Sequence, residues 1–312
     1  MTREAVMNSI ALKKKFCKDC NLPIAVYDNP YFYERLQTID RLFGCIESFN
    51  TFCAELEQYA NEQEYFAYYN EVKDGIIDFI KSQVDFGRFM EESFKVETTY
   101  QKRNLYIEDN DNKTFISIDM KKANFSALRH YAPSIFGFAN TWEQFVGMFT
   151  TNAHIINSKY IRQVVLGACN PKRQIQYERF LMTKLLNHMV SYCPDLNVFS
   201  LGEDEILLEV GDNCKFSLKA LQEIIFNCPE GVGSLVRVEM FDLDKIDGVT
   251  GWTKHHYSFG AFPDDTEKVD FKCVDAEIFH QVVKHYYGEP ITKNDLVFYH
   301  NGRLAKFLQE VA

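Results

Sequence analysis

Glycine and proline are scarce in this chain of 312 residues, with 15 and 8 copies respectively. Flexible linkers and low-complexity segments are usually rich in these residues, so we expect a chain that is nearly all folded domain. No run of 18 apolar residues occurs, which argues against a membrane-spanning helix. A phosphate-binding loop, a dinucleotide fingerprint and a serine-hydrolase motif are also absent, and the hydrolase and dehydrogenase interpretations lose their support.

Basic residues are fewer than acidic residues, with 34 Lys and Arg against 44 Asp and Glu, and the formal net charge is −10. This balance argues against a broadly basic surface for nucleic acid. It leaves room for a local basic groove, and for an acidic pocket that holds metal ions. The nine cysteines follow no disulfide spacing, and the first residues lack the pattern of a signal peptide. We therefore expect a reduced, intracellular protein without a membrane partner.

Apolar and aromatic residues are plentiful, with 46% hydrophobic residues, 27 Phe and 17 Tyr. Up to residue 102 the pattern is helical, as Ile76, Phe79, Ile80 and Val84 form one apolar stripe. We expect most aromatics of this segment to lie in the core. The run Lys13 to Lys15 is typical of a solvated helix face. Residues 1–102 are thus predicted to form a helical N-terminal segment.

After residue 102 the pattern changes to short apolar runs that alternate with helices. Residues 105–108 and 115–118, around the turn cluster 109–113, predict a β-hairpin. Further helices are expected over 121–131, 142–149 and 173–191, and further strands over 197–201, 206–210, 235–241, 269–274 and 296–300, the last before an Asn301-Gly302 turn. The chain is therefore predicted to be α+β, with residues 103–312 forming an antiparallel sheet with packed helices and a C-terminal hairpin extension.

Acidic residues stand at two places where the predicted strands end. Asp119 closes the apolar run 115–118, directly before a helix, and Glu203, Asp204 and Glu205 occupy the tip of a predicted hairpin. If the two elements are sheet neighbours, these carboxylates lie side by side, which is unfavourable unless cations neutralise them. Two Mg²⁺ or Mn²⁺ ions would do so, with Asp119 and Asp204 as ligands and Glu203 or Glu205 supplying a further oxygen.

The two acidic segments resemble motifs A and C of the palm domain of nucleic-acid polymerases. Residues 204–210, Asp-Glu-Ile-Leu-Leu-Glu-Val, are closest to the second acidic motif of family-A DNA polymerases, and residues 119–129 resemble the first motif loosely. The hairpin is also similar to the acidic turns of diguanylate cyclases and tRNA-His guanylyltransferases. Glu203 stands where the family-A motif has histidine. The spacing between the motifs is shorter than in family-A enzymes and longer than in the cyclases.

This resemblance implies a metal-dependent nucleotidyltransferase with a palm-like sheet. Asp119, Asp204 and Glu205 would be the catalytic acids, and Asp119, Asp204 and Glu203 the metal ligands. A hydroxyl would attack the α-phosphate of a nucleoside triphosphate, most simply in a divergent template-dependent polymerase of a virus or mobile element. Primer and template would then be partners, and a further protein could supply a basic groove. A nucleotide cyclase, a guanylyltransferase and an inactive palm used as a scaffold are the alternatives.

Basic residues between the two motifs are candidates for binding the triphosphate. These are Lys159, Arg162, Lys172 and Arg173, and Tyr160 could stack on a base. Each candidate has a simpler interpretation. Asp119 alone could cap a helix, and the acids of the hairpin could form an ordinary solvent-facing turn. Cys17 and Cys20 form half of a zinc motif, and we expect plain thiols because no second half follows.

Overall fold

The structure of the chain, a computed structural model, describes residues 1–95, 97–211, 217–257, 268–300 and 303–307. Within these ranges the strands form a six-stranded sheet and a two-stranded sheet, and helices lie before, between and after them. All strand pairs in the two sheets are antiparallel. The predicted α+β class, with an antiparallel sheet, packed helices and a helical N-terminal segment, is confirmed.

The N-terminal segment is a set of helices that share an aromatic core. These are α1 (Arg3–Asn8), α2 (Ile10–Asp19), α3 (Tyr31–Phe43), α4 (Cys45–Leu56), α5 (Glu62–Ser82) and α6 (Val84–Glu91). Side-chain oxygens of Ser9 and Asn61 cap α2 and α5 by accepting from backbone N–H groups. Phe16 packs on Phe49 and Phe52 with ring centroids 5.0 and 5.6 Å apart. These rings are fully buried, so here the aromatics form core, as predicted.

The large sheet has the strand order β2-β3-β1-β4-β5-β6. Its strands are β1 (Lys113–Met120), β2 (Val198–Leu201), β3 (Glu205–Val210), β4 (Val236–Lys245), β5 (Trp252–Tyr257) and β6 (Lys268–Lys272). Helices α7 (Ala123–Tyr131), α8 (Trp142–Val146), α9 (Ala153–Asn157), α10 (Lys159–Gly167) and α11 (Pro171–Tyr192) connect β1 to β2, and α12 (Leu218–Phe226) lies between β3 and β4. In its first four strands the sheet therefore has split βαβ topology.

The two faces of the sheet have different surroundings. Ile116, Ile118 and Met120 of β1 belong to the main core, which they share with residues of α7 and α11. Phe115 belongs to a second, smaller core on the opposite face. Because side chains alternate along a strand, Ser117 and Asp119 share the face of Phe115. Asp119 is thus held away from the main core, on the less covered face.

One expected hairpin does not form. Residues 105–108 are not a strand, and only a short 3₁₀ helix, η1 (Glu108–Asn110), precedes β1. Strand β1 pairs instead with β3 and β4, which come about 90 and 120 residues later. The prediction of a hairpin over 105–118 was wrong because Leu105 contributes an apolar side chain to the smaller core without pairing as a strand.

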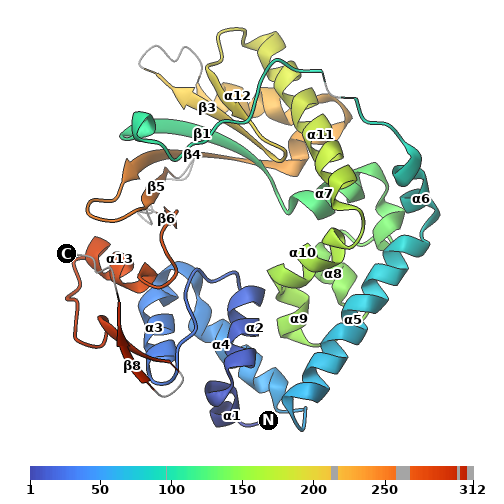
Figure 1. Cartoon of the computed structure of the whole chain (residues 1–312). Coiled ribbons are helices and arrows are strands. Elements are labelled where there is room, and N and C mark those ends of the chain that lie inside the picture. Colours follow the sequence, from blue (N-terminus) through green and yellow to red (C-terminus); the bar gives the residue numbers. More distant parts are fainter. Residues whose placement is uncertain (96, 212–216, 258–267, 301–302, 308–312) are drawn as a thin grey trace.

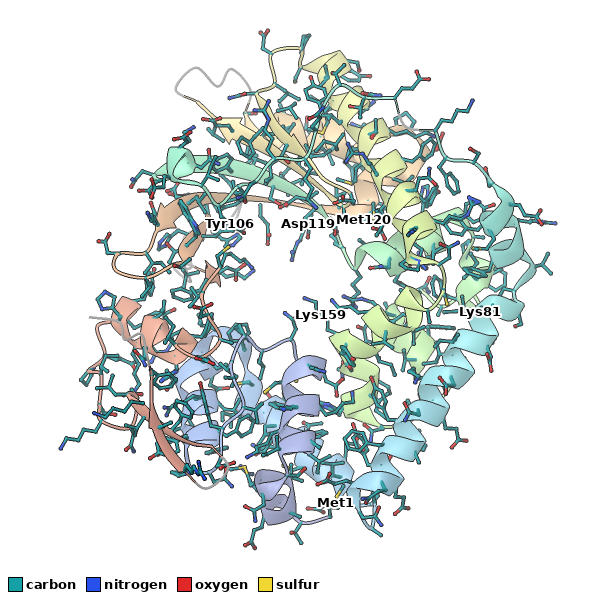
Figure 2. The ribbon with its side chains drawn as sticks, in the orientation of Figure 1. Met1, Lys81, Tyr106, Asp119, Met120 and Lys159 are labelled. Atoms are coloured by element: carbon teal, nitrogen blue, oxygen red, sulfur yellow. The ribbon has the colours of Figure 1, made fainter. Side chains whose placement is uncertain are left out.

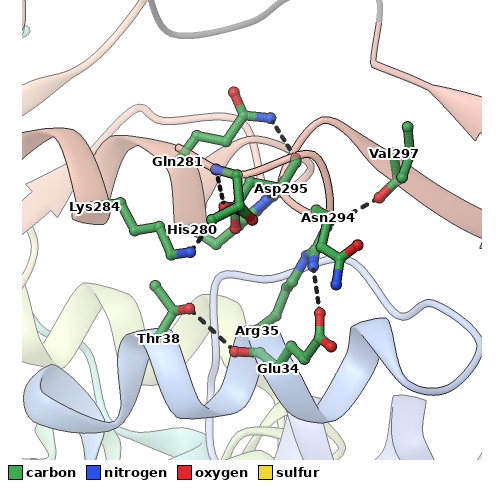
Figure 3. A network of polar contacts seen from close by, with 10 residues as sticks. Glu34, Arg35, Thr38, His280, Gln281, Lys284, Asn294, Asp295 and Val297 are labelled. Carbon is green, nitrogen blue, oxygen red and sulfur yellow. Dashed lines mark hydrogen bonds and ion pairs between the residues drawn. The ribbon is translucent and has the colours of Figure 1, made fainter. Parts of the chain in front are cut away.

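The C-terminal elements pack against the N-terminal helices. Helix α13 (Phe279–Tyr286) and the hairpin of β7 (Val297–His300) and β8 (Arg303–Lys306) lie beside α3 (Figure 1). The Arg35 side chain, 1% exposed, donates hydrogen bonds to the carbonyl oxygens of Asn294 at 2.7 Å and Val297 at 3.1 Å (Figure 3). Lys284 and Asp295 form an ion pair of 2.8 Å beside it. The predicted turn residues Asn301 and Gly302 lie outside the described residues.

The N-terminal helices, the large sheet with its helices and the C-terminal elements are arranged around a central space (Figure 1). Figure 1 shows the large sheet along one side of this space, α10 and α2 facing it from the other side, and α13 and the small hairpin completing the circuit. The side chains of Asp119 and Lys159 lie on opposite sides of this space (Figure 2). The fold thereby brings the acidic end of β1 opposite the first residue of α10.

Candidate active site

The register of the sheet places the two acidic segments side by side. Asp119 of β1 is the direct partner of Glu205 of β3. The backbone N–H of Met120 donates to the carbonyl oxygen of Asp204 at 2.9 Å, so the ladder continues into the turn. That turn is tight, since the N–H of Gly202 donates to the carbonyl oxygen of Glu205 at 2.8 Å. The two predicted elements are therefore sheet neighbours, and their acids gather at one end of the sheet.

The carboxylates in this group affect one another. Burial raises the pKa of Asp119 to about 6; Arg237 opposes this shift, whereas Glu205 and Asp204 add to it. Burial also raises the pKa of Asp204, and Glu205 and Glu203 contribute in the same direction. Like charges at this range disfavour each other's ionised form. The ionised carboxylates therefore repel one another, and a bound cation would reduce this repulsion.

The simpler interpretations of these acids do not match the geometry. The residue at the cap of α7 is Lys122, which has a left-handed backbone and no capping side chain, so Asp119 is not the helix cap. The side chain of Asp119 is 26% exposed, and Asp204 is half-buried. Glu203 alone behaves as a surface residue would, because its carboxylate forms an ion pair of 2.7 Å with Lys102, which lowers its pKa.

Arg237 is the cation that is paired with Asp119. It lies on β4 directly opposite Asp119, and its Nε and Nη2 atoms are 3.0 and 2.9 Å from Asp119 Oδ2. The guanidinium is also 3.6 Å from a carboxylate oxygen of Glu239 on the same strand. An arginine in this position neutralises part of the charge where a metal ion would be needed.

Further cations approach from other elements. Partial desolvation lowers the pKa of Lys159, and the positive charges of Arg162, Lys272 and Arg237 lower it further, while Asp119 raises it. Lys159 from α10, Lys272 from β6 and Arg237 from β4 therefore share one electrostatic neighbourhood. Converging positive charges of this kind are suited to a polyanion such as a triphosphate.

The middle of the open sheet face is occupied by a second charged group. Glu205 accepts a hydrogen bond of 2.6 Å from the Ser117 hydroxyl. Lys254 of β5 is 8% exposed, and its Nζ lies 4.2 Å from the centre of the Phe241 ring. Burial lowers the pKa of Lys254, and the charge of Glu205 opposes that shift. Glu205 is thus oriented by its hydrogen bond from Ser117 and interacts electrostatically with the buried Lys254.

A pocket of about 500 Å³ opens beside the acidic turn. The acids Glu203, Asp204 and Glu205 line it together with Lys102 and Tyr106. Residues 102–106 form one wall of the pocket, and the backbone N–H of Arg103 donates to Ser200 Oγ at 2.9 Å. The volume lies within the range of small-molecule sites, about 300–1,000 Å³.

Glu178 lies behind the acidic turn and has an unusual environment. It is 3% exposed, on α11, and its Oε1 has no hydrogen-bond partner among the described residues. The next residue, Arg179, donates to the carbonyl oxygen of Leu201 at 3.2 Å, which fixes this turn of α11 against the hairpin. Burial, followed by the charges of Asp204 and Glu203, raises the pKa of Glu178 to about 7.

Replacing Glu178 with glutamine is expected to remove a pH-dependent loss of stability. The folded carboxyl stays protonated up to about pH 7, whereas the ordinary pKa of 4.5 lets the unfolded chain ionise earlier. Wild-type stability should therefore fall as the pH rises through this window, by about 3 kcal/mol. In urea titrations, the free energy of unfolding of the variant should rise relative to that of the wild type as the pH increases across the same window. If the difference in unfolding free energy between the variant and the wild type did not change with pH, a raised pKa of Glu178 would be contradicted.

The remaining candidates from the sequence have varied positions. Arg162 is half-buried. Burial lowers its pKa, and the negative charge of Glu143 opposes that shift. The Tyr160 ring lies 5.7 Å from Lys18 Nζ, in a pocket between α2 and α10. Arg173 donates to the carbonyl oxygen of Glu92, just after α6, and Lys172 is exposed. Neither Lys172 nor Arg173 is among the described residues that line the pocket beside the acids.

The structure does not contain a ready-made metal cluster. No group of three or more His, Cys, Asp or Glu side chains arranged to hold a metal ion occurs in the described parts of the chain. Cys17 and Cys20 are free, and burial raises the pKa of each thiol to about 12, as expected for plain thiols. None of the described helices has the length and apolar character needed to cross a membrane.

Comparisons of the chain with protein-family models, with curated proteins and with solved structures found no match. The function must therefore be argued from the chemistry of the site. Sequence reasoning missed several of its charged residues, among them Arg237, Lys254, Lys272 and Glu178. Arg237 could have been found, since Val236-Arg-Val-Glu-Met240 alternates and places Arg237 and Glu239 on one face. Nothing in the local pattern distinguishes Glu178 from a solvated helix position.

Proposed function

We propose that this protein is a metal-dependent nucleotidyltransferase, and that it extends a nucleic-acid strand as a divergent template-dependent polymerase. The observation that carries the proposal is the pairing of Asp119 with Glu205, which brings Asp204 to the same end of the sheet. The split βαβ topology and the similarity of both segments to palm motifs support it. In this reaction an acceptor hydroxyl oxygen bonds to the α-phosphorus of a nucleoside triphosphate, pyrophosphate leaves, and the hydroxyl proton passes to solvent.

The acids fit divalent cations by charge and by position. Asp119 offers hard oxygen ligands from strand β1, and Asp204 offers them from the tight turn that leads into β3. Mg²⁺ typically takes only one or two protein carboxylates. Burial is the main cause of the raised pKa of each aspartate, and the neighbouring carboxylates add to it, so a bound cation would favour their ionised forms. When bound, Mg²⁺ or Mn²⁺ supplies charge stabilisation at the reacting phosphoryl group. Glu205, oriented by Ser117, would complete the negative field, whereas Glu203 is already paired with Lys102.

The cations around the acids fit the other end of the substrate. Lys159, Arg237 and Lys272 come from three different elements, and the charges of Arg237, Lys272 and Asp119 all act on Lys159. Lys159 lies across the central space from Asp119 (Figure 2). A triphosphate placed over Asp119 would meet these charges, which stabilise the leaving pyrophosphate. In this way a strongly acidic chain could bind a polyanion through a local group of cations.

Arg237 is expected to compete with metal ions for Asp119. Its guanidinium bonds the Oδ2 atom that a divalent ion would need, and the ion pair is half exposed and therefore weak. An Arg237→Gln variant should bind Mn²⁺ two- to fivefold more tightly, roughly, while its nucleotide incorporation falls. Free Mn²⁺ measured by electron paramagnetic resonance reports the affinity. Lys245→Gln, which removes a surface ion pair with Glu108 from the far end of β4, is the matched control. Weaker Mn²⁺ binding by Arg237→Gln would contradict this role.

The proposal is tested by supplying the protein with a primer, a template, labelled nucleoside triphosphates and Mg²⁺ or Mn²⁺. Label in a lengthened strand supports the polymerase. Label in a soluble cyclic or dinucleotide product would favour a cyclase, and transfer to the end of a tRNA would favour a guanylyltransferase. If no label is transferred to any acceptor, the proposal is wrong and an inactive palm fold used as a scaffold remains.

A further inference from the structure

A second pocket lies between α2 and α10, next to the candidate active site in the fold. It has a volume of about 710 Å³. Lys14 and Lys18, one turn apart on the exposed face of α2, form one side of it, and Tyr160 and Gln163 of α10 form the other. Its floor is apolar, from the loop that follows α2, including the buried Leu22 and Ile24. None of its described lining residues carries a carboxylate, in a chain with a net charge of −10.

The position of this pocket relative to the acids follows from α10. Lys159, its first residue, points into the central space toward Asp119, and Tyr160, the next residue, lines the pocket (Figure 2). Figure 1 shows α2 and α10 together on the side of this space that faces the sheet. A chain molecule that leaves the acidic end of β1 and crosses the start of α10 would therefore arrive at the pocket.

The lining chemistry matches one ligand class. Two mobile ammonium groups on an exposed helix face suit separate phosphates of a backbone. A partly exposed tyrosine over an apolar floor suits a stacked base, and the Gln163 amide can donate to and accept from a base edge. The Tyr160 ring is held in a positive field, with Lys15 and Lys18 Nζ atoms 5.3 and 5.7 Å from its centre.

We propose that the pocket between α2 and α10 binds an unpaired nucleic-acid strand, through phosphates at Lys14 and Lys18 and a base on Tyr160. The inference rests on the proposed function, because it identifies the strand that the nucleotidyltransferase would use. It adds a binding site that is separate from the acids. The strand lies in the pocket whether or not metal ions and a triphosphate are bound at β1 and β3.

The experiment measures fluorescence anisotropy of a short labelled single strand with the full chain carrying Asp119→Asn and Asp204→Asn, in the presence of a chelator. This parent should bind the strand although it cannot incorporate nucleotides. Adding Lys14→Ala and Lys18→Ala should weaken binding roughly tenfold and reduce the slope of log affinity against log salt by about 1.4, the value for two phosphates of a single strand. Adding Lys81→Ala and Lys219→Ala, two exposed lysines outside the pocket, should change little.

The base contact is tested at Tyr160. Tyr160→Ala should weaken binding roughly tenfold or more, and Tyr160→Phe, which keeps the aromatic face, should bind like the parent. The inference is overturned if the parent does not bind the strand, or if the Lys14 and Lys18 variant matches the Lys81 and Lys219 control. It is also overturned if a free nucleoside triphosphate displaces the strand at equal concentration, since that result indicates a mononucleotide site.

These results are separable from the fate of the proposed function. Strand binding that depends on Lys14, Lys18 and Tyr160, together with a wild type that transfers no nucleotide, would keep the strand site and reject the enzyme. Nucleotide incorporation that is unaffected by the Lys14 and Lys18 substitutions, with unchanged strand affinity, would keep the enzyme and reject this pocket.

Discussion

Replacing Asp119 or Asp204 with asparagine is expected to reduce nucleotide incorporation at least about a thousandfold. Each substitution keeps the size of the side chain but removes the charge that would hold a divalent ion at the end of β1 or in the β2–β3 turn. Incorporation into a labelled strand at saturating Mg²⁺ is the measurement. Glu209→Gln is the matched control, because Glu209 lies at the other end of β3 and pairs with Lys113. The control should retain activity.

The same two variants should fold at least as well as the wild type. Because folding raises the pKa of Asp119 to about 6, the ionised carboxylate is disfavoured in the folded state above that pH. The ion pair that asparagine loses is half exposed and contributes little. A thermal melt at about pH 8 should therefore show an unchanged or higher Tm. Full activity in either variant, or a loss that merely follows unfolding, would contradict the assignment of these acids.

Replacing Asp19 with alanine is expected to destabilise the fold by about 3–5 kcal/mol. The carboxylate of Asp19 is fully buried and accepts three hydrogen bonds: from Lys15 Nζ at 2.5 Å, from Ser158 Oγ at 2.6 Å and from His154 Nε2 at 2.9 Å. Burial already lowers the pKa of Lys15 to about 8, and Asp19 is the main group that opposes this. Without Asp19, a buried ammonium loses its partner. Urea denaturation measures the effect.

A compensating substitution separates the lost charge pair from a general packing defect. Asp19→Asn combined with Lys15→Met removes both charges and should recover a large part of the lost stability. Asp19→Ala should also lower nucleotide incorporation in protein that remains folded, because Ser158 caps α10 and immediately precedes Lys159. A loss below about 1 kcal/mol would show that the buried pair is not needed to hold α2 against α9 and α10.

The two acidic strand ends, but not their pairing, could be predicted from local signals. Apolar runs ended in acids at Asp119 and at the 203–205 turn, and tight turns and strand ends are specified by short stretches of sequence. That the two strands are neighbours was a hypothesis, which the resemblance to palm motifs supported, because β1 and β3 are far apart in the chain. The register that opposes Asp119 to Glu205 depends on how β1 packs its alternate side chains on α7 and α11.

The environment of single charges was beyond local prediction. The run Lys13 to Lys15 was expected to be solvated, yet Lys13 and Lys15 are buried, and only Lys14 is exposed. Lys13 donates to the carbonyl oxygen of Tyr27, and Lys15 pairs with Asp19. Tyr27 lies in the loop after α2, and Asp19, the last residue of α2, is enclosed by His154 and Ser158 from later in the chain. The sequence of α2 alone therefore could not reveal that these two lysines are buried. Arg237 and Lys254 were missed for the same reason, because each acquires its acidic neighbour only when the sheet forms.

Binding of Mn²⁺ by the acidic end of the sheet tests the central claim most directly. Electron paramagnetic resonance of free Mn²⁺, in the presence of a non-hydrolysable nucleoside triphosphate, measures affinity without requiring turnover. The site predicts that Asp119→Asn and Asp204→Asn each weaken Mn²⁺ binding about tenfold or more, and that Glu209→Gln does not. Equal Mn²⁺ affinity in the wild type and in both aspartate variants would contradict a divalent-cation site between β1 and β3.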